Sequence, residues 1–318
     1  MQASCPVCTN NKSLLAQGKD GEFELFQCPD CDLKFSWPML AGSREWYDSA
    51  YLMRRVVPQP KVQNYFQIGL SSLPGRSKIL DIGCGEGDFI KYAADRGYQV
   101  WGTDFSEEMI ALAKKNAPQA KFFAGTFEEF LRQHPQEKFN GAVIFEVLEH
   151  LSDPLSTLRE VKKILKPGGR VIVSVPNRGA WPVTHFGDHP PNHLSWWSKR
   201  SLSILVQKAG FEVESIKTTS YLLSLHCLAT YLTTQLPLYA LLGQKKKFIG
   251  GQASEAGSLD LGRRTSSFLR HYGPWLRKIR NAIYWPAVLL LSPFMWPLVE
   301  GTSLVLSAKF NATNSGKS

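Results

Sequence analysis

Two pairs of cysteines have the residue types and the spacing of a metal site. Cys5 and Cys8 form a C-P-V-C pair, and Cys28 and Cys31 form a C-P-D-C pair. Two-residue spacing lets one tight turn point both thiolates at the same ion, and two such turns complete a tetrahedral zinc site. The first residues contain no basic-then-apolar run, so we expect a reducing compartment that disfavours disulfides. The pairs therefore predict a structural Zn²⁺ ribbon over residues 1–40, with redox cysteines as the alternative.

A glycine-rich turn that begins at Gly83 is the second group with binding chemistry. An apolar run leads into Asp81, two further glycines follow at alternate positions, and a second apolar run ends at Asp104. This order predicts a strand, a tight turn, a helix and a second strand, whose terminal acid can bind the hydroxyls of a ribose. Asp81 and Glu86 would repel the pyrophosphate of a dinucleotide, whereas they suit a cofactor with a cationic amino group. The carboxylates therefore favour S-adenosylmethionine (SAM) over NAD.

This segment and two later ones resemble the class I SAM-dependent methyltransferases. D-I-G-C-G-E-G at 81–87 is similar to their first motif. F-N-G-A-V-I-F-E-V-L-E-H-L-S-D-P at 139–154 is similar to their fourth strand and its loop, and I-L-K-P-G-G-R-V-I-V-S-V-P-N at 164–177 to the turn into their fifth strand. The E-V-L-E-H sequence is in turn similar to the ubiquinone-biosynthesis O-methyltransferases. The resemblance covers about residues 77–220 and implies an α/β fold with a Rossmann-like seven-stranded sheet.

The resemblance also implies which residues contact the cofactor. Those that match the family's positions around SAM and its methyl group are Asp81, Gly83, Gly85, Asp104, Phe105, Thr126, Phe145 and Glu146. Asp81 and the glycines would contact the methionine part, Asp104 would bind the ribose, and Phe105 would lie against the adenine. Thr126 stands where the family often has an aspartate that bonds the adenine amine, so this contact departs from the family pattern.

Transfer of a methyl group to an oxygen or amine also requires a base for the acceptor's proton. Histidine is the natural candidate at neutral pH. His150 and His193 lie on loops expected to follow the fourth and fifth strands, where open α/β sheets place their active sites. The histidine-rich run at 185–198 suits a loop over a substrate pocket, with Trp196 and Trp197 as its walls. We predict His193 and His150, together with Glu146, as the catalytic candidates.

The same loop after the fourth strand suggests a second use of its polar residues. Glu146, Glu149 and His150 could hold a divalent cation, as relatives with this motif are thought to do, because carboxylate and imidazole ligands suit such ions. The alternative, which we favour, is that Glu149 and His150 form a polar cap on the next loop.

The stretch before the last expected strand is apolar and basic. A sixth strand is expected near 210–220, and the only good candidate for the seventh is the alternating run at 301–311. Residues 221–300 are therefore predicted to be a helical insertion; within it, nine lysines and arginines face only two acids between 243 and 281, and apolar residues follow. Such a segment suits an anionic membrane surface. A lid or dimer surface and a pair of bilayer-crossing helices are the alternatives, and the positive-inside tendency disfavours the crossing.

Composition and motifs together give the expected organisation of the chain. With 318 residues, 43% of them hydrophobic, and a net charge of +10, the chain has room for a large domain and a small one. The predicted parts are a zinc ribbon at 1–40, connector helices at 41–76, the methyltransferase domain at 77–220 plus 301–312, and the insertion at 221–300.

The predicted function is methylation of an oxygen or nitrogen on a small-molecule, glycan or lipid-linked acceptor. We expect the protein in the cytoplasm, peripherally on the inner face of the membrane. One alternative is an RNA methyltransferase that binds nucleic acid through the ribbon and the basic insertion. The other is a non-catalytic SAM-binding or zinc-scaffold protein.

Overall fold

The computed structural model of the chain describes residues 2–44, 46–47, 64–179, 189–219 and 303–311. These residues all belong to one unit of the fold. The predicted insertion at 221–300 lies outside the described residues, as do residues 45 and 48–63 of the predicted connector. Within the part of the chain that is described, no helix has the length and apolar character needed to cross a bilayer.

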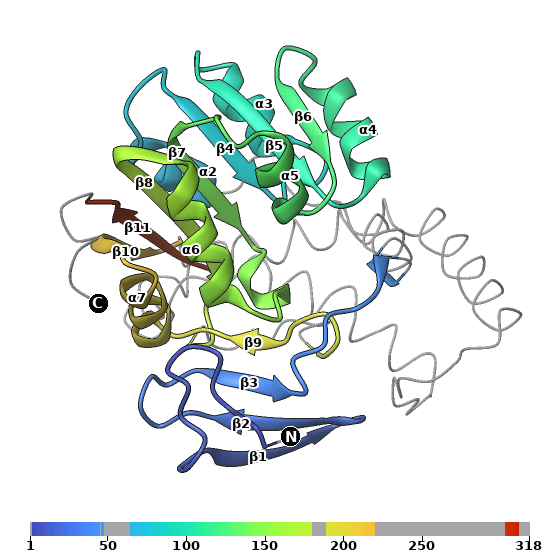
Figure 1. Ribbon diagram of the computed structural model, residues 1–318, viewed down its shortest axis with the longest axis vertical. Coiled ribbons are helices and arrows are strands. Elements are labelled where there is room, and N and C mark those ends of the chain that lie inside the picture. Colours follow the sequence, from blue (N-terminus) through green and yellow to red (C-terminus); the bar gives the residue numbers. More distant parts are fainter. Residues whose placement is uncertain (1, 45, 48–63, 180–188, 220–302, 312–318) are drawn as a thin grey trace, which may run out of the picture. The chain divides into compact units, whose positions relative to one another are not determined.

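Seven strands form the larger sheet, in the order β10-β11-β8-β7-β4-β5-β6 (Figure 1). In chain order these strands are β4 (Lys78–Ile82), β5 (Gln99–Asp104), β6 (Lys121–Ala124), β7 (Phe139–Phe145), β8 (Leu165–Pro176), β10 (Glu212–Thr218) and β11 (Ser303–Lys309). The pairs among β4 to β8 are parallel, whereas β11 is antiparallel to both of its neighbours, β8 and β10. The predicted α/β fold with a Rossmann-like seven-stranded sheet is confirmed, and its last strand lies inside the sheet.

Helices cover both faces of this sheet. They are α2 (Asn64–Ser71), α3 (Asp88–Ala94), α4 (Glu107–Asn116), α5 (Phe127–Gln133), the short 3-10 helix η1 (Leu148–His150), α6 (Pro154–Ile164) and α7 (Lys199–Lys208). Because successive side chains of a strand point to opposite faces, neighbours such as Ile79 and Leu80 enter different cores. Residues of α2, α3 and α4 fill one core, and residues of α5, α6 and α7 fill the other. Burial on both faces explains why the strands read as nearly continuous apolar runs.

Several of the helices that follow strands begin at residues whose side chains accept a backbone amide of the first turn. Ser106 caps α4, Asp153 caps α6 ahead of Pro154, and Thr126 caps α5. Each cap fixes the point at which the preceding loop ends. The caps therefore limit the length of the loops that carry the polar residues at the sheet's edge.

A second, smaller sheet contains the N-terminal ribbon. Its first three strands are β1 (Leu15–Asp20), β2 (Phe23–Gln27) and β3 (Lys34–Trp37). The fourth is β9 (Ser195–Trp196), which comes from the histidine-rich segment and pairs antiparallel with β3 (Figure 1). The ribbon thus gains a strand from the segment between β8 and α7, a pairing that the sequence did not predict.

The ribbon also shares a hydrophobic core with the larger sheet. Leu33 and Phe35 of the ribbon are fully buried in the same cluster as Trp197 and Leu202. The prediction that Trp197 is a wall of a substrate pocket is therefore wrong, because its side chain has no exposed surface and packs in this core. The Trp196 ring instead lies against Lys34, whose Nζ is 5.2 Å from the ring centroid.

The position of β11 between β8 and β10 predicts that the end of the chain is needed for folding. A chain that stops after residue 302 loses a strand that hydrogen-bonds on both sides, together with the buried Leu304 and Leu306. We expect it to lack a cooperative thermal unfolding transition, which differential scanning calorimetry would test. A chain that stops after Asn311 keeps the strand and is the matched control. A normal transition in the shorter chain would contradict the assigned role of β11.

Candidate active site

The carboxyl ends of β4, β5 and β7 lie at one edge of the parallel part of the sheet, and most of the predicted site residues lie there. The β4 strand is the common neighbour, because it pairs with β5 on one side and β7 on the other. Asp81 lies opposite Gly102 of β5 and Val143 of β7. Asp104 ends β5, and Phe145 ends β7. This is the edge where open α/β sheets bind their ligands.

The glycine turn after β4 is bound to the end of β5. The amides of Gly83 and Cys84 donate to the Thr103 carbonyl at 2.8 and 3.0 Å, and the Gly85 amide donates to Asp104 Oδ2 at 2.9 Å. Gly83 has φ +76°, and a Cβ there would lie 2.5 Å from the Val147 side chain. A larger residue cannot occupy this position without moving the loop after β7. The turn therefore leaves a backbone-lined cradle beside two carboxylates.

Asp81 is the most deeply buried acid of this cradle. Its side chain is 2% exposed, and burial, followed by the nearby Asp104 carboxylate, raises its pKa well above the usual range. Two carboxylates in such a place would be stabilised by a cation rather than by another anion. The predicted residues Asp81, Gly83, Gly85 and Asp104 therefore fit the positively charged SAM.

The remaining residues predicted to contact the cofactor have identifiable local roles. The Phe105 ring lies edge-on to Tyr47 with 5.5 Å between the centroids. The Phe145 ring packs against Phe89 with 4.9 Å between the centroids. Thr126 is exposed, and its hydroxyl accepts a hydrogen bond from the Glu129 amide in a capping box. Sequence reading did not assign this capping role to Thr126.

Both predicted catalytic histidines come together next to the cofactor cradle. The His150 and His193 rings are 4.7 Å apart in an edge-to-face arrangement. His150 Nδ1 lies 2.5 Å from the Asn192 carbonyl, which can only accept, so this nitrogen carries a proton. His150 Nε2 is 3.9 Å from the buried carboxylate of Glu149. A neutral His150 therefore has its lone pair on Nε2, the nitrogen that faces Glu149.

Of the three residues considered for a divalent cation, Glu149 and His150 lie in one group and Glu146 does not. Glu149, His150 and His193 each offer a ligand atom within 4.8 Å of the other two. Among the described residues this group includes His193 and does not include Glu146. Glu146 follows β7 with φ +55°, and its Oε1 accepts a hydrogen bond from Ser174 at 2.9 Å. The third ligand of a cation here would therefore be His193, which comes from a distant loop.

Tyr47 connects the two halves of the site and was not singled out from the sequence. Its ring contacts those of Phe105 and His150, with centroid separations of 5.5 and 5.8 Å. The sequence contained no signal that selects this tyrosine among the neighbouring aromatics.

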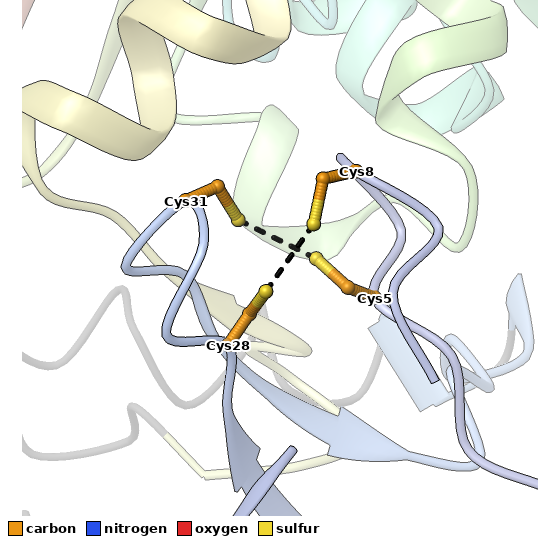
Figure 2. Close-up of side chains that lie close together, drawn as sticks. All are labelled: Cys5, Cys8, Cys28 and Cys31. Atoms are coloured by element: carbon orange, nitrogen blue, oxygen red, sulfur yellow. Dashed lines mark hydrogen bonds between the residues drawn. The ribbon is translucent and has the colours of Figure 1, made fainter. Parts of the chain in front are cut away.

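The four N-terminal cysteines point toward a common centre (Figure 2). Cys5 Sγ is 3.5 Å from Cys31 Sγ, and Cys8 Sγ is 3.2 Å from Cys28 Sγ. All four sulfurs lie within 4.8 Å of one another, and the residues are free cysteines. Sulfurs bound to one zinc at about 2.3 Å would be about 3.8 Å apart, whereas a disulfide measures about 2.05 Å. The arrangement fits a tetrathiolate metal site better than two disulfides.

Comparison with known proteins gives consistent matches to methyltransferases. Residues 53–216 match the model of the family described as methyltransferase domain. A ubiquinone biosynthesis O-methyltransferase of Aliivibrio fischeri is 34% identical over 119 residues, which cover 36% of this chain and 50% of that protein. A probable S-adenosylmethionine-dependent methyltransferase of Mycolicibacterium smegmatis is 32% identical over 136 residues, which cover 43% of this chain and 52% of that protein. The chain thus matches about half the length of these curated relatives.

A solved structure shows the same fold. The crystal structure of a SAM dependent methyltransferase from Archaeoglobus fulgidus aligns with 82% of this chain and 99% of its own, at a TM-score of 0.51 and 17% sequence identity. At this identity the likeness concerns the fold.

The buried acid of the cradle predicts how SAM affinity depends on charge and pH. Asp81→Asn removes the charge that would pair with the cofactor, and we expect the Kd for SAM to rise at least about tenfold, or about 1.4 kcal/mol. Because the pKa of Asp81 is raised, acidification protonates it in the free protein, so SAM affinity should fall as the pH is lowered. Isothermal titration calorimetry would measure both effects. The exposed Asp95→Asn is the control, and unchanged affinity in Asp81→Asn would contradict the assignment.

The cysteine cluster predicts a metal content that can be measured directly. We expect about one zinc ion per purified chain, and Cys28→Ser should lower the zinc content because three thiolates hold the ion more weakly. Inductively coupled plasma mass spectrometry provides the measurement. Cys84→Ala is the matched control, since Cys84 lies in the glycine turn and should leave the zinc content unchanged. A chain that contains no zinc after expression in zinc-supplemented medium would contradict the metal site.

Proposed function

Because this chain belongs to the methyltransferase-domain family and is a class I SAM-dependent methyltransferase, we propose that it methylates an oxygen of a small-molecule, glycan or lipid-linked acceptor. The observation that carries this proposal is the group formed by Glu149, His150 and His193, which lies beside the cofactor cradle. A deprotonating group is required for a hydroxyl acceptor, and the arrangement supplies one. A nitrogen acceptor is the alternative. It has less need of such a base, because an amine loses its proton with less assistance.

In the proposed reaction, bound SAM supplies a methyl group on a sulfonium. Asp81 and the glycine turn orient the amino acid part, and Asp104 orients the ribose. Methyl transfer from SAM to an acceptor oxygen would be an in-line displacement, so the residues that orient the cofactor would contribute largely through alignment. The proton of the acceptor hydroxyl passes to a histidine.

His150 is the better placed of the two histidines to receive that proton. Its Nδ1–H donates to the Asn192 carbonyl, which leaves the lone pair on Nε2. The buried Glu149 carboxylate, 3.9 Å from Nε2, would stabilise the imidazolium that forms. His193 lies edge-on to this ring and is 7% exposed, so it contributes as a contact beside the base. This assignment reverses the order in which the sequence ranked the two residues.

The acceptor class is inferred from the relatives and from composition. One of the two curated relatives described above is named as a ubiquinone biosynthesis O-methyltransferase, which supports a small hydroxylated acceptor. The basic and apolar composition of 221–300 supports a location on an anionic membrane surface, where a lipid-linked acceptor would be found. Under this proposal the protein is cytoplasmic and peripheral to the membrane.

The alternatives have less support. An RNA methyltransferase that uses a catalytic thiol is disfavoured at Cys84, because burial and the Asp81 and Asp104 charges raise the pKa of this thiol well above its usual range. A non-catalytic scaffold would have no need for the acids of the cradle. A cation held by Glu149, His150 and His193 would replace the histidine base with metal activation of the hydroxyl, and the dependence of activity on added Mg²⁺ distinguishes the two.

Incubation with radiolabelled SAM and separate pools of acceptors would test the proposed function. We expect label in a small-molecule or lipid extract and none in bulk RNA. His150→Ala should lower the rate of transfer by about 10²-fold or more, while SAM affinity stays unchanged. If His150 is the base, activity should not depend on added Mg²⁺ while the ribbon keeps its zinc. Label that enters only RNA, or a His150→Ala variant with full activity, would contradict the proposal.

A further inference from the structure

The ribbon and the proposed acceptor side of the active site share one short segment of chain. This segment is residues 192–197, which include His193 and the β9 strand. It lies between β3 of the ribbon and η1 of the catalytic domain, and it contacts both. The ribbon either packs beside the enzyme without affecting its site or determines where this segment lies.

The peptide groups of Leu194 are bound from both sides. Its amide donates to the Glu149 carbonyl at 2.7 Å, on the catalytic side. Its carbonyl accepts from the Ser36 amide at 2.8 Å and from the Ser36 hydroxyl at 3.2 Å, on the ribbon side. Leu194 directly follows His193, and its own side chain is fully buried. The backbone beside the histidine is therefore fixed by the ribbon and by the catalytic loop together.

The metal-binding turn of the ribbon is held by two arginines of the catalytic domain. Arg178, just after β8, donates from Nη1 to the Asp32 carbonyl at 2.8 Å, and its Nη2 lies 2.6 Å from the Asp32 carboxylate. Arg200, in the first turn of α7, donates to the Asp30 carbonyl at 2.8 Å. Asp30 and Asp32 are the immediate neighbours of Cys31. The geometry of the cysteine turn and the position of these catalytic elements therefore depend on each other.

Arg178 also contacts the shared segment directly. Its amide donates to the Trp197 carbonyl at 3.0 Å, and the preceding Asn177 bridges to Trp197. One residue thus joins the end of β8, the cysteine turn and the histidine segment. A two-residue strand such as β9 cannot hold its position through its own hydrogen bonds, so it needs such flanking contacts.

We propose that the metal-bound ribbon is a positioning element of the active site, with Arg178 and Asp32 as positioning residues that hold the His193 segment against His150. The proposal rests on the proposed function, because it assigns the segment to the acceptor side of the reaction. The chain of contacts runs from the cysteine turn through Asp32 and Arg178 to Trp197, and from Ser36 to Leu194. It ends at the Asn192 carbonyl that accepts from the His150 ring. Loss of the metal should therefore disturb the acceptor side and leave the cofactor cradle intact.

Hydrogen exchange measured by mass spectrometry on the full chain, saturated with SAM, tests this coupling without an identified acceptor. Zinc is removed with a chelator, and peptides that cover 28–37, 189–198 and 78–104 are compared. We expect the first two to exchange at least about tenfold faster together, while the β4–β5 peptide stays protected. Continued protection of 189–198 after the ribbon peptide has lost its protection would overturn the proposal.

Variants test the same coupling with the metal in place. In Arg178→Ala we expect the ¹⁵N signal of His150 Nδ1 to lose its hydrogen-bonded character, while the Kd for SAM changes less than about twofold. Asp32→Asn should have the same effect, and asparagine tolerates the φ of +64° found there. Arg170→Ala is the matched control: Arg170 lies on β8, the strand that precedes Arg178, and its ion pair with Glu214 has the same 26% and 32% exposure as the pair of Arg178 with Asp32.

The two variants and the control separate the outcomes. An unchanged His150 signal in both Arg178→Ala and Asp32→Asn would overturn the proposal, as would an equal change in Arg170→Ala. Failure of the wild-type chain to bind SAM would contradict the proposed function instead. In that case the exchange experiment, carried out on the chain without SAM, would still show whether the ribbon holds residues 192–197 in place.

Discussion

The site depends on the parallel pairing of β4 with both β5 and β7. These pairings put Asp81 opposite Gly102 on one side and Val143 on the other, so the loops after all three strands meet at one edge. A slip of one residue in either pairing would turn the alternate side chains to the wrong face and exchange the two cores. The buried residues on both faces of the sheet make such a slip costly. The apolar strands therefore determine where the acids and histidines lie.

The same burial disfavours the charged form of the acid in the cofactor cradle. Asp81 is almost fully buried near Asp104, and its pKa is raised in the free protein. A group whose pKa is higher in the folded than in the unfolded state stabilises the fold at low pH, and that contribution is lost as the pH rises through the folded pKa. Above that pKa the free protein holds a carboxylate that is poorly solvated. A bound cation offsets this cost, which couples cofactor binding to stability.

Local sequence patterns were sufficient to predict much of the fold and of the cofactor half. The glycine turn, the acid that ends β5, the two cysteine pairs and the final strand each depend on spacing within a few residues. Long-range contacts were not predictable in this way. The Arg178 guanidinium reaches Asp32 across 146 positions of the chain, and Trp197 is buried because the ribbon packs over it. The group around Glu149 contains His193 and not the predicted Glu146, which likewise follows from the position of a distant loop.

The ribbon illustrates how a small motif can become part of a larger site. A three-stranded ribbon leaves the edge of β3 with unpaired backbone groups, and such edges are commonly covered. Here the covering strand is β9, so the pairing that protects the edge also places the residues next to His193. The ribbon has too few apolar residues to fold without help, and it obtains that help from the cysteine cluster and from the core around Trp197. Because the two sources of stability are shared, the order of the ribbon and the order of the histidine segment are physically linked.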